Sequence, residues 1–266
     1  MNYFIDLNPI CTDKCISPNE YNMVDGKSEP LINNMRMFLV TQFKKYKIDF
    51  KTCDVDKNDY GTLGLNIDGT RLTCDYLGPS TYYASQKMTN EDILKYVIST
   101  REFGGHIIWP SKLACIGRVG NNGSEIMKSI NTARSYCLRE RLDYTLYEIK
   151  QWYFDEKDKG TKIFQKVLEA NRNWFNKFGE GENGFSTFIK VFAFQECIDP
   201  ISLNPYDFES YNGCEYNEVI EKAKKDIDNY IPQDLKTYKN YIEGTVYAIQ
   251  KRNNSIKNSH KSFQKF

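Results

Sequence analysis

The chain has 266 residues, of which 40% are hydrophobic and 27% charged, with a formal net charge of +1. This length and composition are typical of a globular protein with one large domain or two small ones. A net charge so close to zero argues against a polybasic protein that binds nucleic acid over its whole surface. Because no run of about 18 apolar residues occurs, the sequence predicts no membrane-spanning helix and no membrane partner.

Eight cysteines are scattered over the chain. Residues 1–10 are mixed in polarity and lack the apolar run of a secretory signal. The scattered cysteines and the missing signal together predict a cytoplasmic protein. Because disulfides are rare in reducing compartments, its thiols are expected to be reduced.

The N-terminal half is expected to begin with an extended arm. Residues 1–30 are polar and contain three prolines, which favours an extended segment over a helix. Apolar residues then recur every four positions at Met35, Leu39 and Phe43, which predicts a helix over 31–46.

Short β-like segments and one short helix are expected next. Glycines interrupt residues 50–83, and the Asp68-Gly69 pair is a favoured turn for a hairpin. Residues 89–99 are predicted to form a helix. The apolar, β-branched run at 106–109 is bounded by glycines and a proline, which predicts a buried strand.

The C-terminal half is predicted to be mostly helical. The segment 184–197 is apolar nearly all round, which is typical of a central buried helix. Further helices are expected at 124–138, 142–153, 163–178, 219–230 and 235–249. The expected fold class is therefore α+β, with short strands in a mixed N-terminal half packed on a helical C-terminal half. The expected domains are an extended N-terminal arm (1–30), a single α+β domain (31–250) and a basic C-terminal tail (251–266).

Two metal-site patterns fail on their spacing. Asp54, Asp56 and Asn58 alternate as in a calcium loop, but the sixth and twelfth positions do not hold the required Gly and Glu. Cys11 and Cys15 could contribute to a zinc site, but the chain has only two histidines. A solvated acidic turn and buried thiols are the simpler interpretations. The sequence therefore predicts no metal site, and any cofactor stays unknown.

A glycine-rich turn at 117–123 lies between the predicted strand and a predicted helix. It has neither the Gly-Lys-Ser/Thr ending of a P-loop nor the spacing of a dinucleotide fingerprint. A strand, a glycine-rich turn and a helix start would still direct backbone N–H groups at an anion, with Lys112 and Arg118 close by in sequence. The alternative is a plain surface loop.

A second group of polar residues follows at 131–143. Asn131 and Arg134 are three residues apart, so they share one face of a helix. The guanidinium fork suits phosphate or carboxylate. Asp143 follows Arg139 and Arg141, and it could cap the next helix while it pairs with one of them. The alternative is a solvated helix face with a capping aspartate.

Four segments occur in the same order as in an uncharacterised bacterial domain family, which the chain resembles. They are FGGHIIWP at 103–110, SINTAR at 129–134, ERLDYTLYEIKQWY at 140–153, and the run at 174–199. This chain departs from the family pattern at Ser135, Leu142 and Glu196. The resemblance implies no reaction, but it points to a site formed by Asn131, Arg134, Arg141, Asp143 and Gln195.

His106 is the only histidine inside the predicted domain. A histidine on an apolar strand is usually a core or edge residue, although its pKa suits acid–base catalysis. The candidate catalytic residues are therefore Asp143, His106 and Glu196. The candidate ligand-binding residues are Lys112, Arg118, Asn131, Arg134, Arg141 and Gln195.

Two functions of different classes fit these residues. The first is binding of, or catalysis on, a phosphate-bearing ligand such as a nucleotide, a dinucleotide or a nucleic acid. A small bacterial toxin or a phage-defence effector would fit this function. The second is a non-enzymatic module that docks a protein or an RNA. Whether the chain is an enzyme, and its oligomeric state, stay open.

Overall fold

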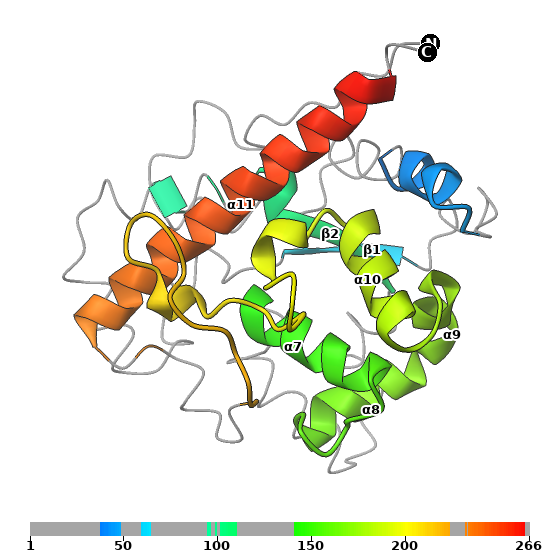
Figure 1. Ribbon diagram of the computed structural model, residues 1–266, viewed down its shortest axis with the longest axis horizontal. Coiled ribbons are helices and arrows are strands. Elements are labelled where there is room, and N and C mark those ends of the chain that lie inside the picture. Colours follow the sequence, from blue (N-terminus) through cyan, green and yellow to red (C-terminus); the bar gives the residue numbers. More distant parts are fainter. Residues whose placement is uncertain are drawn as a thin grey trace.

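The computed structural model describes residues 38–48, 60–64, 95–96, 99, 102–110, 141–223, 232 and 234–263. The named elements in these ranges are β1 (Tyr60–Gly64), η4 (Phe103–Gly105), β2 (His106–Pro110), α7 (Leu142–Tyr153), α8 (Lys162–Ala170), α9 (Arg172–Phe175), η6 (Asn176–Phe178), α10 (Gly181–Val191), η7 (Gln195–Cys197), η8 (Phe208–Ser210) and α11 (Leu235–Phe263). Residues 38–45 are also helical. Figure 1 shows the long helix α11 running beside the group formed by α7, α8, α9 and α10.

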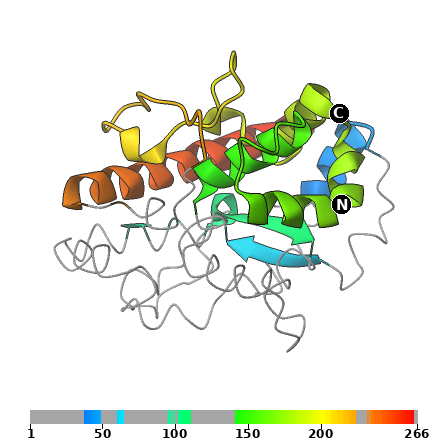
Figure 2. The same ribbon diagram turned by 90° about the horizontal axis from the view of Figure 1, so that it is seen from below.

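The strand predicted at 106–109 is confirmed. It is β2, which pairs antiparallel with β1 so that Gly64 lies opposite His106 and Thr62 opposite Ile108. Figure 2 shows the two strands lying beneath the layer of helices. Ile107 is buried, so this strand contributes to the core as an apolar β-branched run should.

The predicted α+β fold class is wrong, because the described residues are mostly helical. The two strands β1 and β2 are the named strands of the described part of the chain. Short apolar runs broken by glycine do not distinguish a strand from an irregular segment, because both lack the helical period. The hairpin predicted around Asp68-Gly69 and the helix predicted at 124–138 lie outside the described residues.

The core is built largely from aromatic rings of α7, α9, η6 and α10. Phe188 of α10 is fully buried, and its ring centroid lies 5.5 Å from that of Phe178 and 4.8 Å from that of Phe192. Trp174 packs edge-on against Phe178 at 5.0 Å. Edge-to-face and tilted ring pairs of this kind add to the free energy of area burial. The helix predicted at 184–197 is present as α10 with one buried face, but it ends at Val191, and Lys190 is exposed.

The Gly104 backbone packs directly on α11. The Gly104 N–H donates to Oδ1 of Asn253 at 2.8 Å, and a Cβ at Gly104 would lie 2.7 Å from the carbonyl oxygen of Ile249. The buried Arg252 donates through Nη1 to the Gly104 carbonyl at 2.6 Å and through Nε to the Phe192 carbonyl at 2.8 Å. The first glycine of the Gly-Gly pair is therefore required by close backbone approach. The region assigned to a basic tail is helical as far as Phe263.

Between α10 and residue 223 the chain is irregular apart from η7 and η8, and it is held by isolated bridges. Ile198 bridges to Pro205, Tyr206 to Val219, and Tyr211 to Tyr216. The helix predicted at 219–230 does not begin at its predicted start, because residues 219–223 are not helical. The bridge from Val219 to Tyr206 provides the backbone hydrogen bonds that a helical turn would otherwise supply.

Candidate functional site

A buried cluster of charged side chains joins the start of α7 to η8. Nε of Arg141 donates to Oδ1 of Asp143 at 3.0 Å, and Nη2 donates to Oδ2 at 2.8 Å. Nη1 of the same guanidinium donates to Oε1 of Glu209 at 2.5 Å, and Oδ1 of Asp207 lies 3.7 Å from Nη2. The Arg141 and Asp143 side chains are 3% and 0% exposed. One guanidinium is thus surrounded by three carboxylates.

Two tyrosine rings enclose the same guanidinium. Its central carbon lies 4.8 Å from the ring centroid of Tyr144 and 4.5 Å from that of Tyr241. A planar guanidinium packs favourably on an aromatic face, and the attraction increases when water is excluded. Arg141 is therefore held on its faces by rings and at its edges by carboxylates.

Local sequence explains why these groups meet. Arg141 is the residue before α7, and Asp143 lies in the first turn, where a negative charge is favourable. Oδ2 of Asp143 also accepts the backbone N–H of Phe208 at 3.1 Å. Asp207 caps η8 by accepting the Glu209 N–H at 3.0 Å. The predicted pairing of Asp143 with a neighbouring arginine is present, and it fastens η8 to α7.

The charges of this cluster shift several pKa values. Burial alone would lower the pKa of Arg141, but the carboxylates of Asp143 and Glu209 raise it well above its ordinary value. Burial raises the pKa of Asp207 to about 6, and the negative charge of Asp143 adds to the effect. Arg141 therefore stays charged and is neutralised by the protein's own carboxylates. This geometry disfavours a role for Arg141 in holding an external anion.

The other predicted site residues are placed apart from this cluster or are not described. Gln195 and Glu196 lie on η7 with exposed side chains. Within the described ranges no hydrogen bond or ion pair joins them to Arg141 or Asp143. His106 begins β2, and only its backbone is described. The remaining predicted ligand residues, Lys112, Arg118, Asn131 and Arg134, lie outside the described residues.

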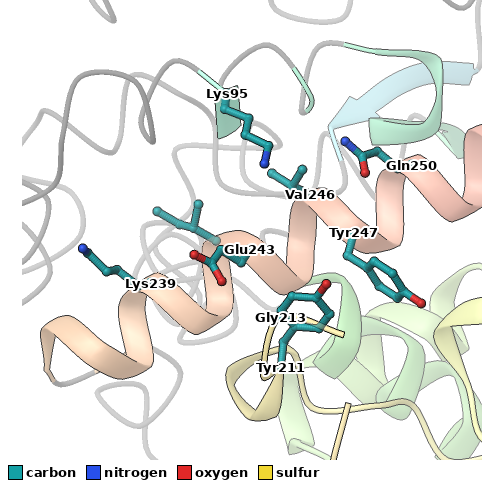
Figure 3. Close-up of a pocket in the computed structure, with 9 residues that line it drawn as sticks. Lys95, Tyr211, Gly213, Lys239, Glu243, Val246, Tyr247 and Gln250 are labelled. Carbon is teal, nitrogen blue, oxygen red and sulfur yellow. The ribbon is translucent and has the colours of Figure 1, made fainter. Parts of the chain in front are cut away.

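A pocket of about 190 Å³ lies beside α11 and the segment that follows η8. Figure 3 shows Lys95 approaching one side of the helix and Tyr211 lying on the other. The polar and aromatic side chains that line it are Lys95, Tyr211, Lys239, Glu243, Tyr247 and Gln250. Within the described ranges neither Lys95 nor Lys239 forms an ion pair. The pocket thus combines two available ammonium groups, one carboxylate and two tyrosine rings.

The aromatic wall of the pocket is held by contacts with η8. The rings of Tyr211 and Tyr247 lie 5.0 Å apart between centroids. Tyr216 packs against both, and its hydroxyl donates to the Gly244 carbonyl at 2.6 Å. A Cβ at Gly244 would lie 2.6 Å from the Phe208 carbonyl oxygen, so a glycine lets α11 approach η8 closely. The Arg141 cluster therefore positions Tyr211 indirectly, through η8.

A further buried acid lies at the contact between α7 and α8. Glu148 accepts the Thr161 N–H at 2.7 Å and the Gln165 side-chain amide at 2.6 Å. Burial raises its pKa to about 7, and the hydrogen bonds from Gln165 and Thr161 oppose that shift. Because the carboxylate binds a backbone N–H at the start of α8, we interpret Glu148 as a cap for that helix.

Sequence reasoning missed the pocket residues. Lys239, Glu243 and Tyr247 recur every four positions on a predicted helix, which places them on one face. The shared face of these three residues could be predicted from their spacing. The position of Tyr211 could not, because it lies on an irregular segment distant in sequence. In the described part of the chain no group of acidic, cysteine or histidine side chains could hold a metal ion.

Comparisons with known proteins place the chain in a family without assigning a reaction. In the described ranges no helix is long and apolar enough to cross a bilayer. No curated protein and no solved structure matches the chain. A family profile, described as a family of unknown function (DUF6994), matches residues 25–256. The expected membership of an uncharacterised domain family is thereby confirmed. The chain belongs to the DUF6994 family.

Proposed function

We propose that this protein binds a phosphate-bearing ligand that carries an aromatic ring, namely a nucleotide, in the pocket beside α11. The observation that carries the proposal is the presence of two lysines and two tyrosines in the lining of that pocket. Lys95 and Lys239 come from separate segments, as do Tyr211 and Tyr247. Ammonium groups attract phosphate, and tyrosine rings pack against a base.

The size of the pocket indicates how such a ligand would lie. Its volume of about 190 Å³ is below the roughly 300–1,000 Å³ of a site that encloses a whole drug-sized ligand. A base would therefore fill the pocket, while the phosphate stayed near the exposed rim. Stacking on an aromatic side chain contributes about 1–3 kcal/mol per base. The affinity would then depend on both the ring and the charge.

Titration calorimetry with AMP, adenosine and inorganic phosphate tests the proposal. We expect AMP to bind more tightly than either fragment, because it alone uses the rings and the lysines together. Tyr247→Ala should weaken AMP binding about tenfold, in line with the loss of one stacking contact. Tyr247→Phe should retain most of the affinity, since it keeps the ring. Absence of AMP binding at millimolar concentration would reject the function.

Lysine variants test the contribution of charge. Lys239→Ala should weaken AMP binding while leaving adenosine binding unchanged. Lys190→Ala is the matched control, since Lys190 is an exposed lysine on α10, away from the pocket. The same calorimetric titration is repeated with a 5′-phosphorylated single-stranded oligonucleotide. Tighter binding of the oligonucleotide than of AMP would identify the end of a nucleic-acid strand as the source of the nucleotide.

A non-enzymatic interaction module is the second candidate. It is favoured by the buried pairing of Arg141 with Asp143, which gives these predicted site residues a structural role. Such a module would bind RNA or protein over a surface rather than in a pocket. RNA binding that persists in Tyr247→Ala and weakens with salt would support this second function over the first.

A further inference from the structure

We infer that the pocket beside α11 selects ribonucleotides over deoxyribonucleotides, with the Glu243 carboxylate accepting hydrogen bonds from the ribose hydroxyls. The inference rests on the proposed nucleotide binding and adds the substrate class. It comes from the order of side chains along α11, which Figure 3 displays.

The helix presents an ammonium group, a carboxylate and a ring in that order. Lys239, Glu243 and Tyr247 follow one another at intervals of four residues, so they share a face and succeed each other about every 6 Å. A nucleotide presents a phosphate, a ribose and a base in the same order. If the base packs on Tyr247 and the phosphate meets Lys239, the ribose lies at Glu243.

Gln250 extends this match by one position. It lies three residues after Tyr247, farther along α11, and it also lines the pocket, on the side of the helix that Lys95 approaches. Its side-chain amide offers both donors and an acceptor, which suits the polar edge of a base. Lys95, which approaches from outside α11, adds a second positive charge to the rim.

The chemistry of Glu243 explains why a carboxylate lies in a pocket for an anion. It is exposed, and in the described ranges it forms no ion pair and no hydrogen bond through its side chain. An ionised carboxylate only accepts hydrogen bonds, and it repels phosphate. The ribose hydroxyls are the donors that lie between a base and its phosphate. A carboxylate here therefore costs affinity for simple anions and adds specificity for a ribonucleotide.

Calorimetry with AMP, 2′-deoxy-AMP, 2′,3′-dideoxy-AMP and inorganic phosphate tests the inference. We expect AMP to bind about tenfold more tightly than the dideoxy compound, the lower range for a hydrogen bond to a charged group. Glu243→Ala should abolish this preference. The same substitution should weaken AMP binding but leave phosphate binding equal or tighter, because a repulsive charge is removed.

Glu182→Ala is the matched control, since Glu182 is an exposed acid on α10, outside the pocket. It should keep the preference for AMP, and a thermal melt should show both variants folded. Equal affinities for AMP and its deoxy analogues would overturn the inference while nucleotide binding itself stood. Absence of binding by every nucleotide would reject the proposed function and the inference with it.

Discussion

Arg141 and Asp143 form a two-point ion pair inside the protein, with Nε to Oδ1 at 3.0 Å and Nη2 to Oδ2 at 2.8 Å. The pair lies two residues apart in sequence, yet its main consequence is at long range. Because Asp143 also accepts the Phe208 N–H, the pair connects α7 to η8 and, through η8, to the wall of the pocket. A predicted binding group is thus part of the scaffold.

Removal of Arg141 should destabilise the fold strongly. Arg141→Met would leave the fully buried carboxylate of Asp143 without its partner, which typically costs about 3–5 kcal/mol of unfolding free energy. Urea unfolding followed by circular dichroism measures the loss. The double variant Arg141→Met with Asp143→Leu should recover part of it, because the buried charge of Asp143 is removed as well, while Glu209 and Asp207 still lack the guanidinium. A loss below about 1 kcal/mol in the single variant would show that the pair is solvated.

Glu148 should make stability depend on pH near neutrality. Its pKa rises from 4.5 to about 7 on folding, because burial penalises the charged form. Between these values the folded chain keeps a proton that the unfolded chain releases. The contribution of Glu148 to the free energy of unfolding is therefore full below pH 4.5 and is lost as the pH rises through about 7. Urea unfolding of the wild type and of Glu148→Gln at several pH values measures how the unfolding free energy of each protein changes with pH.

The variant Glu148→Gln supplies the reference for that measurement, since it removes the titrating group but keeps an oxygen that accepts the Thr161 N–H. The difference in unfolding free energy between wild type and variant should fall from pH 4.5 to pH 7. A difference that stays constant over this range would mean that Glu148 ionises at its ordinary pKa and that water reaches it.

Gly104→Ala should destabilise the contact between η4 and α11. The new Cβ would lie 2.7 Å from the Ile249 carbonyl oxygen and 2.6 Å from Oδ1 of Asn253. Overpacking of this kind costs about 1–3 kcal/mol. Adding Asn253→Ala should not rescue the variant, because the backbone oxygen of Ile249 remains. Thermal melting of the single and double variants checks this, and full recovery in the double variant would place the strain on the Asn253 side chain.

Binding of AMP should weaken as salt increases. Raising the ionic strength from about 0.05 M to about 0.5 M shortens the Debye length severalfold and screens the exposed ammonium groups. In Lys239→Ala the dependence on salt should be shallower, because one of the two lysines at the pocket is absent. Calorimetry at four salt concentrations gives both slopes. Identical slopes for wild type and variant would show that Lys239 does not contact the phosphate.

Sequence reasoning succeeded where the structure depends on local pattern. The strand at His106 and the buried helix around Phe188 follow from short apolar runs and from helical periodicity. The helix expected from Val219 did not begin there, because a bridge to Tyr206 took its place. A bridge depends on a partner elsewhere in the chain, so no local window contains that information.

By itself the sequence determined which segments are apolar and periodic, and so it determined most of the described helices and the chain's membership of an uncharacterised family. Only the tertiary structure decided what the charged residues do. Arginine is a residue type that commonly binds anionic ligands. In this fold Glu209 neutralises the charge of Arg141 and Tyr241 packs on its face, and both are distant in sequence. Lys95 and Tyr211 look unremarkable alone, but folding places both in the lining of one pocket beside α11. The physical reason is that hydrophobic patterning is local, whereas the pairing of charges depends on which segments folding brings together.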